Sequence, residues 1–158
     1  MIIKSLNGPV GGATGGAGST FTQAVETVDV AFTNAQGATI TLGLPVALTT
    51  TANSVDGKLA VLPAAANLAS FYGIALKNTP NNATGLARAF GFVRSVAIFA
   101  TGASVTIAAG SPVGPGPASL GVNSTGLRDN LGPVIAMEAI GAAICSPGGY
   151  ARGFVRAL

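Results

Sequence analysis

The chain of 158 residues has no histidine, no tryptophan, a single cysteine and only five acidic residues. Without histidine it lacks the most common general base, the most common metal ligand and every Ser–His or Cys–His pair of nucleophilic catalysis. The carboxylates are spread over both halves of the sequence, so no pair is placed for acid–base chemistry. We predict that the protein is not an enzyme and that it requires no metal or other cofactor.

Long apolar segments are also missing. No run free of glycine, proline and charge reaches the roughly 18 residues of a membrane-spanning helix, and residues 95–107 come closest. The first residues, MIIKSLNGPVGG, contain no apolar stretch long enough for a signal peptide. We therefore expect no membrane partner and synthesis in the cytoplasm. The lone Cys145 is interpreted as a small buried side chain, because one thiol makes neither a disulfide framework nor a zinc site.

Charge is scarce, at 8% of residues against about 25% in ordinary soluble domains. The eight lysines and arginines are dispersed, with no basic run and no interleaved aromatic residues of the kind that stack nucleic-acid bases. This pattern predicts no nucleic-acid partner, and no motif predicts a small-molecule substrate. Since 49% of residues are hydrophobic, a monomer would expose large apolar patches, and we expect a trimer or another closed ring.

Glycine is concentrated near the N-terminus, in residues 7–19, NGPVGGATGGAGS. Each ordered glycine costs about 1 kcal/mol of backbone entropy, so this segment is a poor helix or strand. No lysine follows it, as a phosphate-binding loop would require. Residues 1–20 are therefore predicted to form a flexible N-terminal arm.

Alternation of polar and apolar residues begins at residues 21–30, FTQAVETVDV. A period of two with many Val, Thr and Phe residues predicts β-strands. Only residues 63–72, PAAANLASFY, could form a helix, of one or two turns. Short strands separated by Gly, Pro and Asn corners predict a single all-β domain over residues 21–158, either a small barrel or a sandwich.

An internal repeat divides this domain into two related β-units, about residues 38–98 and 103–158. Four short segments recur in the same order. The matched segments are 39–46 with 104–113 (including a two-residue insertion), 53–57 with 123–126, 73–76 with 134–137, and 85–94 with 149–156. The second pair are turn signals, and the other three are predicted strands and their corners.

This duplicated order of a Gly-x-Pro-Val corner, a turn, a Gly-Ile-Ala-Leu strand and a Gly-Phe-Val-Arg strand resembles the small β-barrel decoration (cement) proteins of bacteriophage capsids. The resemblance covers about residues 38–158. It implies a homotrimer on the capsid exterior, made in the cytoplasm of a bacterial host, that binds the phage major capsid protein and stabilises contacts between its subunits. The longer glycine-rich N-terminal region and the scarcity of acidic residues depart from the family pattern.

A carbohydrate-binding or adhesion module of a virion or cell surface is the alternative interpretation, because all-β trimers rich in Thr and Gly suit that function too. Sugar platforms usually need exposed aromatic side chains. The chain has seven phenylalanines, two tyrosines and no tryptophan, which argues against this alternative.

Contact residues are sought among charged side chains on the predicted strands. Arg94 and Arg156 hold matched positions in the repeat. Alternation predicts one face made of Phe90, Phe92, Arg94, Val96 and Ile98. Either Arg94 reaches water over its neighbours, or one or both of Arg94 and Arg156 lie in a subunit contact and pair with a carboxylate, for which Glu138 is the best candidate. The predicted subunit or capsid contacts are Arg94, Arg156, Glu138, Arg88, Arg152 and Lys4.

Overall fold

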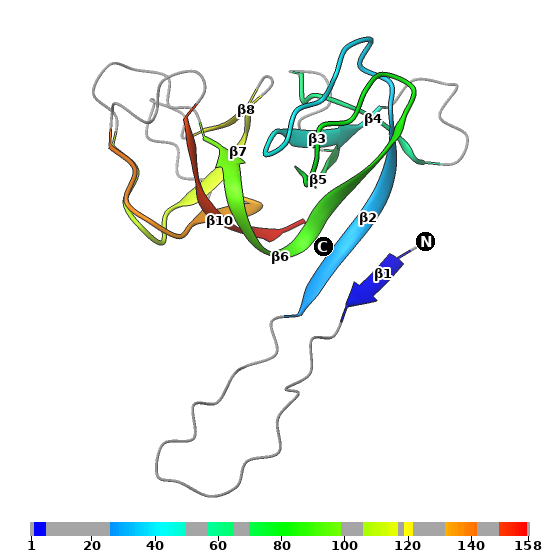
Figure 1. Cartoon of the computed structure of the whole chain (residues 1–158). Helices are drawn as coiled ribbons and strands as arrows, with labels where there is room; N and C mark the ends of the chain where they lie inside the picture. The colour runs from blue at the N-terminus through cyan, green and yellow to red at the C-terminus, as the bar shows by residue number, and fades with distance from the viewer. Residues whose placement is uncertain are drawn as a thin grey trace, which may run out of the picture.

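The structure, a computed structural model, describes residues 2–5, 26–49, 57–64, 70–98, 106–116, 119–121, 132–141 and 149–157. These residues form ten β-strands and no α-helix (Figure 1), which confirms the all-β prediction. The strands are β1 (Ile2–Ser5), β2 (Thr27–Asn34), β3 (Pro45–Leu48), β4 (Leu59–Val61), β5 (Phe71–Ala75), β6 (Thr84–Ala97), β7 (Pro112–Gly116), β8 (Ser119–Gly121), β9 (Val134–Ala136) and β10 (Tyr150–Arg156).

Five strands close into a ring that we call the first barrel. β2 pairs with β4, β4 with β3, β3 with β5 and β5 with β6, and β6 pairs back with β2. The β2–β4 pair is parallel and the other four pairs are antiparallel. Closure of the ring leaves none of these five strands as a free edge of an open sheet.

The second barrel continues from the far half of β6. There β6 pairs with β10, β10 with β9, β9 with β7 and β7 with β8. β8 returns to contact β6, although no ladder joins these two strands in the described part of the chain. β6 therefore belongs to both barrels and runs between them (Figure 1).

The two barrels repeat the same strand register. Pro45 of β3 faces Ile74 of β5, and Pro112 of β7 faces Ile135 of β9. Each barrel also has an isolated antiparallel bridge, between Ile40 and Thr79 in the first and between Ile107 and Ile140 in the second. Residues at matching points of these ladders are called equivalent below.

The ladders correct the sequence comparison at two points. The bridges make Ile107 equivalent to Ile40, with the same spacing to the proline, so the second unit has no two-residue insertion. Ala75 faces Ala87 and Ala136 faces Gly153, which makes Phe154, rather than Arg152, the equivalent of Arg88. A shift of two residues keeps every side chain on its face of a strand, so the apolar pattern alone did not reveal either error.

β6 bends between the barrels because its regular pairing is interrupted twice. Opposite β2, Ala89 is an extra residue, since Val28 faces Phe90 and Asp29 faces Arg88. Gly91 follows with a φ of 113°, a conformation that other residues rarely adopt. Further along, Arg94 and Ser95 together stand opposite Arg152. Such bulges increase the local twist of a strand.

Each barrel has its own apolar core. The first cluster is Val30, Phe32, Ile40, Val46, Ala60, Ala75, Ala87 and Ala89. The second is Val93, Val96, Ile98, Ile107, Val113, Val134, Ala136, Ile140, Ala151 and Val155, joined by Ile74. Ile74 lies on the outer side of the first barrel, next to the inward Ala75, so it packs the first barrel against the second.

Two sequence predictions differ from the structure in part. Residues 2–5 of the predicted arm form β1, which pairs antiparallel with β2, with Ile3 opposite Asp29. Backbone hydrogen bonding to β2 compensates for the lost chain entropy in these four residues, and residues 6–25 lie outside the described residues. Within the predicted helix, Phe71 and Tyr72 instead belong to β5, while residues 65–69 also lie outside the described residues.

Candidate functional site

The outer side of β6 carries arginine and phenylalanine in alternation. Gly91 and Val93 are buried, whereas Arg88, Phe90 and Phe92 are half-buried. Arg94 is exposed. Period-two geometry places these alternate residues on one side of the strand.

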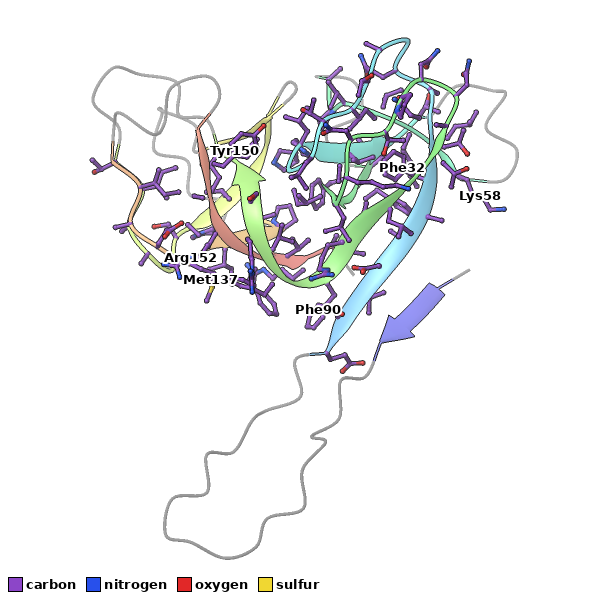
Figure 2. The ribbon with its side chains drawn as sticks, in the orientation of Figure 1. Phe32, Lys58, Phe90, Met137, Tyr150 and Arg152 are labelled. Carbon is purple, nitrogen blue, oxygen red and sulfur yellow. The ribbon has the colours of Figure 1, made fainter. Side chains whose placement is uncertain are left out.

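β10 adds a second row beside the first. Phe154 stands opposite Phe92 and Arg156 opposite Phe90. The rings of Phe90 and Phe154 pack edge to face, with centroids 5.2 Å apart and planes at 83°. We call this surface the Arg–Phe face; its members are Arg88, Phe90, Phe92, Arg94, Arg152, Phe154 and Arg156. Figure 2 shows Phe90 and Arg152 on the outer side of the two strands.

Arg88 is fixed at one end of the face. Its Nε donates to Asp29 Oδ1 at 2.6 Å and its Nη2 donates to Asp29 Oδ2 at 3.1 Å, a bidentate pair between β6 and β2. Its Nη1 donates to the Phe92 carbonyl at 2.6 Å. The two side chains are 19% and 24% exposed, so the pair is partly shielded from solvent.

Arg152 is held in a similar way at the other end. Its backbone N–H donates to Glu138 Oε1 at 2.7 Å, and its Nε donates to Oε2 at 3.0 Å. The backbone hydrogen bond, followed by the side-chain one, lowers the pKa of Glu138 below its ordinary value. The sequence analysis offered Glu138 as a partner for Arg94 or Arg156, but within the chain Arg152 binds its carboxylate.

Arg94 and Arg156 complete the positive charge of the face. No partner of the Arg94 guanidinium occurs among the described residues. The predicted row that continued to Val96 and Ile98 is wrong, because the bulge at Arg94 and Ser95 turns Val96 and Ile98 into the core. Arg156 Nε donates to the Gly132 carbonyl at 3.1 Å.

Lys4, the last of the predicted contacts, lies on β1 opposite Val28 of β2. Only its backbone position is described. The structure therefore brings Arg88, Arg94, Arg152 and Arg156 together, adds Glu138 at their margin, and leaves Lys4 on a separate strand.

Apolar side chains border the face. Ile135 of β9 stands opposite Phe154, and Met137 follows with 48% of its surface exposed. On the side of the first barrel, a shallow hollow of about 380 Å³ is lined by Leu42, Leu76, Arg88, Phe92, Val93, Arg94 and Ser95. The surface thus has an apolar centre with guanidinium groups around it.

Within the described ranges, no three acidic or cysteine side chains gather into a possible metal site. No helix in the part of the chain that the structure describes has the length and apolar character to cross a membrane. No family model matches the chain, and no curated protein sequence matches it. The Arg–Phe face combines half-buried aromatic rings with guanidinium groups, residue types that are enriched at protein–protein interfaces.

The sequence predicted Phe90, Phe92 and Arg94 on one face, but not the third aromatic residue, Phe154, beside them. The statement that no aromatic residues interleave with the basic ones was wrong, because Arg88-x-Phe90-x-Phe92-x-Arg94 and Arg152-x-Phe154-x-Arg156 interleave the two residue types with the period of a strand. Reading every second residue reveals both rows. The pairing of the two rows becomes visible only when the partner strands are known.

Proposed function

We propose that this chain is a structural virion protein that binds the outside of a bacteriophage capsid and stabilises contacts between major capsid subunits. The observation that carries the proposal is the Arg–Phe face. Aromatic residues and arginine are enriched at protein–protein interfaces, whereas lysine and glutamate are depleted there. Of the seven residues in the face, three are phenylalanine and four are arginine.

The architecture supports a clamping role. Two barrels share β6, and each has its own apolar core, so strand pairing and core packing hold both strands of the face in place. Rigid scaffolds lose little conformational entropy when they dock. A protein of this kind can join neighbouring subunits by binding across their boundary.

Self-association is the second part of the proposal. Eight basic and five acidic residues are few for the surface of a 158-residue chain. Protein contacts, with other copies and with the shell, would cover apolar surface that charge does not. We propose a homotrimer on the capsid exterior, assembled from chains made in the bacterial cytoplasm.

Reconstitution tests this function. Phage heads filled with DNA but assembled without this chain are mixed with the purified protein and sedimented. We expect the protein to sediment with the heads and to raise the temperature at which they release DNA. Heads that bind no protein at micromolar concentration, or that bind it and release DNA at an unchanged temperature, would contradict the proposal. Omission of heads is the control for sedimentation of the protein alone.

A further inference from the structure

The proposed function leaves open which surface meets the shell. Resting on that function, we infer that the Arg–Phe face is the shell-binding surface and that its partner is a different protein, with an apolar centre surrounded by carboxylates. Copies of this chain then associate through other surfaces. The inference follows from the arrangement of apolar groups, the location of the acidic residues and the geometry of the rings.

The centre of the face is apolar and only partly covered. Phe92, Phe154 and Ile135 lie side by side across β6, β10 and β9, and all three are half-buried in the free chain. A partner that packs on these groups removes their remaining apolar surface from water. Clusters of this kind at the centre of an interface provide most of its binding energy.

The margin of the face is positively charged. Arg94, Arg152 and Arg156 are exposed, on the two strands that also carry the phenylalanines. Guanidinium groups pair with carboxylates in a fixed planar geometry. A partner surface with acidic residues around an apolar patch therefore complements this face in both position and charge.

A second copy of this chain is a poor partner for the same surface. Of its five acidic side chains, Asp29 and Glu138 already bind Arg88 and Arg152 on this face. Two copies brought together face to face would oppose arginines to arginines, which disfavours the contact. Only Glu26, Asp56 and Asp129 remain elsewhere in the chain. Three carboxylates spread over a second copy are few for a face with four arginines, which favours another protein as their source.

Single-stranded nucleic acid fits the face less well than an acidic protein. Phe90 and Phe154 cover each other edge to face, which leaves no parallel faces on which successive bases stack. Arg88 and Arg152 are already neutralised by carboxylates. This leaves less free positive charge along the face than a groove that follows a phosphate backbone needs.

Charge reversal at Arg94 tests the inference. Arg94 is exposed and Arg94→Glu removes no described contact, so the variant should fold normally. Lys58→Glu makes the same charge change at an exposed site beside β4, far from the face in Figure 2. We expect Arg94→Glu to weaken binding to DNA-filled heads by at least about tenfold, and Lys58→Glu to change it by less than about twofold. Met137→Asp, at the apolar margin, should also weaken binding.

The outcomes of these binding measurements distinguish the proposed function from this inference. If the wild-type chain does not bind heads, the proposed function and this inference both fail. If it binds heads and Arg94→Glu binds equally well, only the inference fails. Light scattering of the free variants should show an unchanged oligomer; loss of the oligomer with Arg94→Glu would assign the face to a second copy. Binding of a thymidine oligonucleotide that Arg94→Glu abolishes, with head binding intact, would assign it to nucleic acid.

Discussion

One outward row of side chains crosses each barrel, and the two rows differ in chemistry although they lie at matching points of the ladders. In the first barrel the row is Asp29, Arg88, Ile74 and Pro45. In the second it is Phe92, Phe154, Ile135 and Pro112. The first row is closed by an ion pair and by burial of Ile74, whereas the second remains apolar and half-exposed. The chain therefore covers the outward row of the first barrel itself and leaves the outward row of the second half-exposed.

The ends of the barrels differ in the same way. In the first, Asn34 is fully buried and its Nδ2 donates to the carbonyls of Ala38 and Thr79, at 2.8 and 2.7 Å. Its equivalent in the second barrel is Ile98, and the equivalent of Thr79 is Ile140. The end of the first barrel is therefore filled by a polar side chain that hydrogen-bonds to the neighbouring loops, and the matching end of the second barrel by an apolar side chain.

The core-facing residues at equivalent positions of the two barrels also differ in size. Phe32 faces Gly85 in the first barrel, and Val96 faces Ala151 in the second. A Cβ atom at Gly85 would lie 2.6 Å from the Phe32 ring. The large residue on one strand therefore requires the small one on its neighbour, which keeps the core volume nearly constant.

The largest effect should come from Phe32. Its side chain is 1% exposed and fills the first barrel, so we expect Phe32→Ala to lower the free energy of unfolding by about 3–5 kcal/mol. Val96→Ala at the equivalent position removes two methyl groups and should cost about 2 kcal/mol. Urea unfolding measures both. Equal losses would contradict the larger contribution that we expect from the Phe32 ring.

A smaller effect is expected at the barrel ends. Asn34→Ala removes two donated hydrogen bonds and one accepted from the Gln36 N–H at 2.8 Å, so we expect a loss of about 2–3 kcal/mol. Ile98→Val, the matched change in the second barrel, should cost about 1 kcal/mol. Hydrogen exchange separates the two roles. Amide exchange should accelerate in residues 35–38 for Asn34→Ala alone. Acceleration there in both variants would show that Asn34 has no special role in ordering this loop.

The smallest effect should come from Glu138, at the edge of the second row. Its pKa is lowered in the folded chain by the Arg152 hydrogen bonds, so its contribution to stability is present above the ordinary value of 4.5 and is lost as the pH falls through the lower, folded pKa. Thermal melts of wild type and Glu138→Gln should differ slightly at neutral pH and converge in acid. A difference in melting temperature that widens in acid would contradict this, because it would mean that Glu138 stabilises the fold in its protonated form.

Much of the fold follows from local chemistry. Alternation in residues such as 27–34 predicts strands, and Gly-Pro and Asn corners predict where they turn, because these properties depend on neighbours along the chain. The register of the repeat does not follow from local chemistry, because a shift of two residues keeps each side chain on the same face of its strand. The participation of β6 in both barrels cannot be predicted locally either, because it depends on which distant strands pair with its edges.

The candidate site was predicted only in part for the same reason. Arg94 was correctly placed beside Phe90 and Phe92, because regular alternation continues that far. The bulge opposite Arg152 depends on pairing with β10, about sixty residues later in the chain, and no local pattern marks it. Glu138 was noticed as a lone acid in an apolar run, but its partner was set by the pairing of β9 with β10.

The shared strand also fixes the order in which the protein can be completed during synthesis. Every strand of the first barrel lies before residue 98, so that barrel can close while the remainder is still being translated. Among the described residues, the second half of β6 has a ladder with β10 alone, which begins at Tyr150. At about 5–20 residues per second, the ribosome needs several seconds to add the intervening segment. An edge of β6 that is unpaired during that interval can pair with other nascent chains, which makes it a site of potential aggregation.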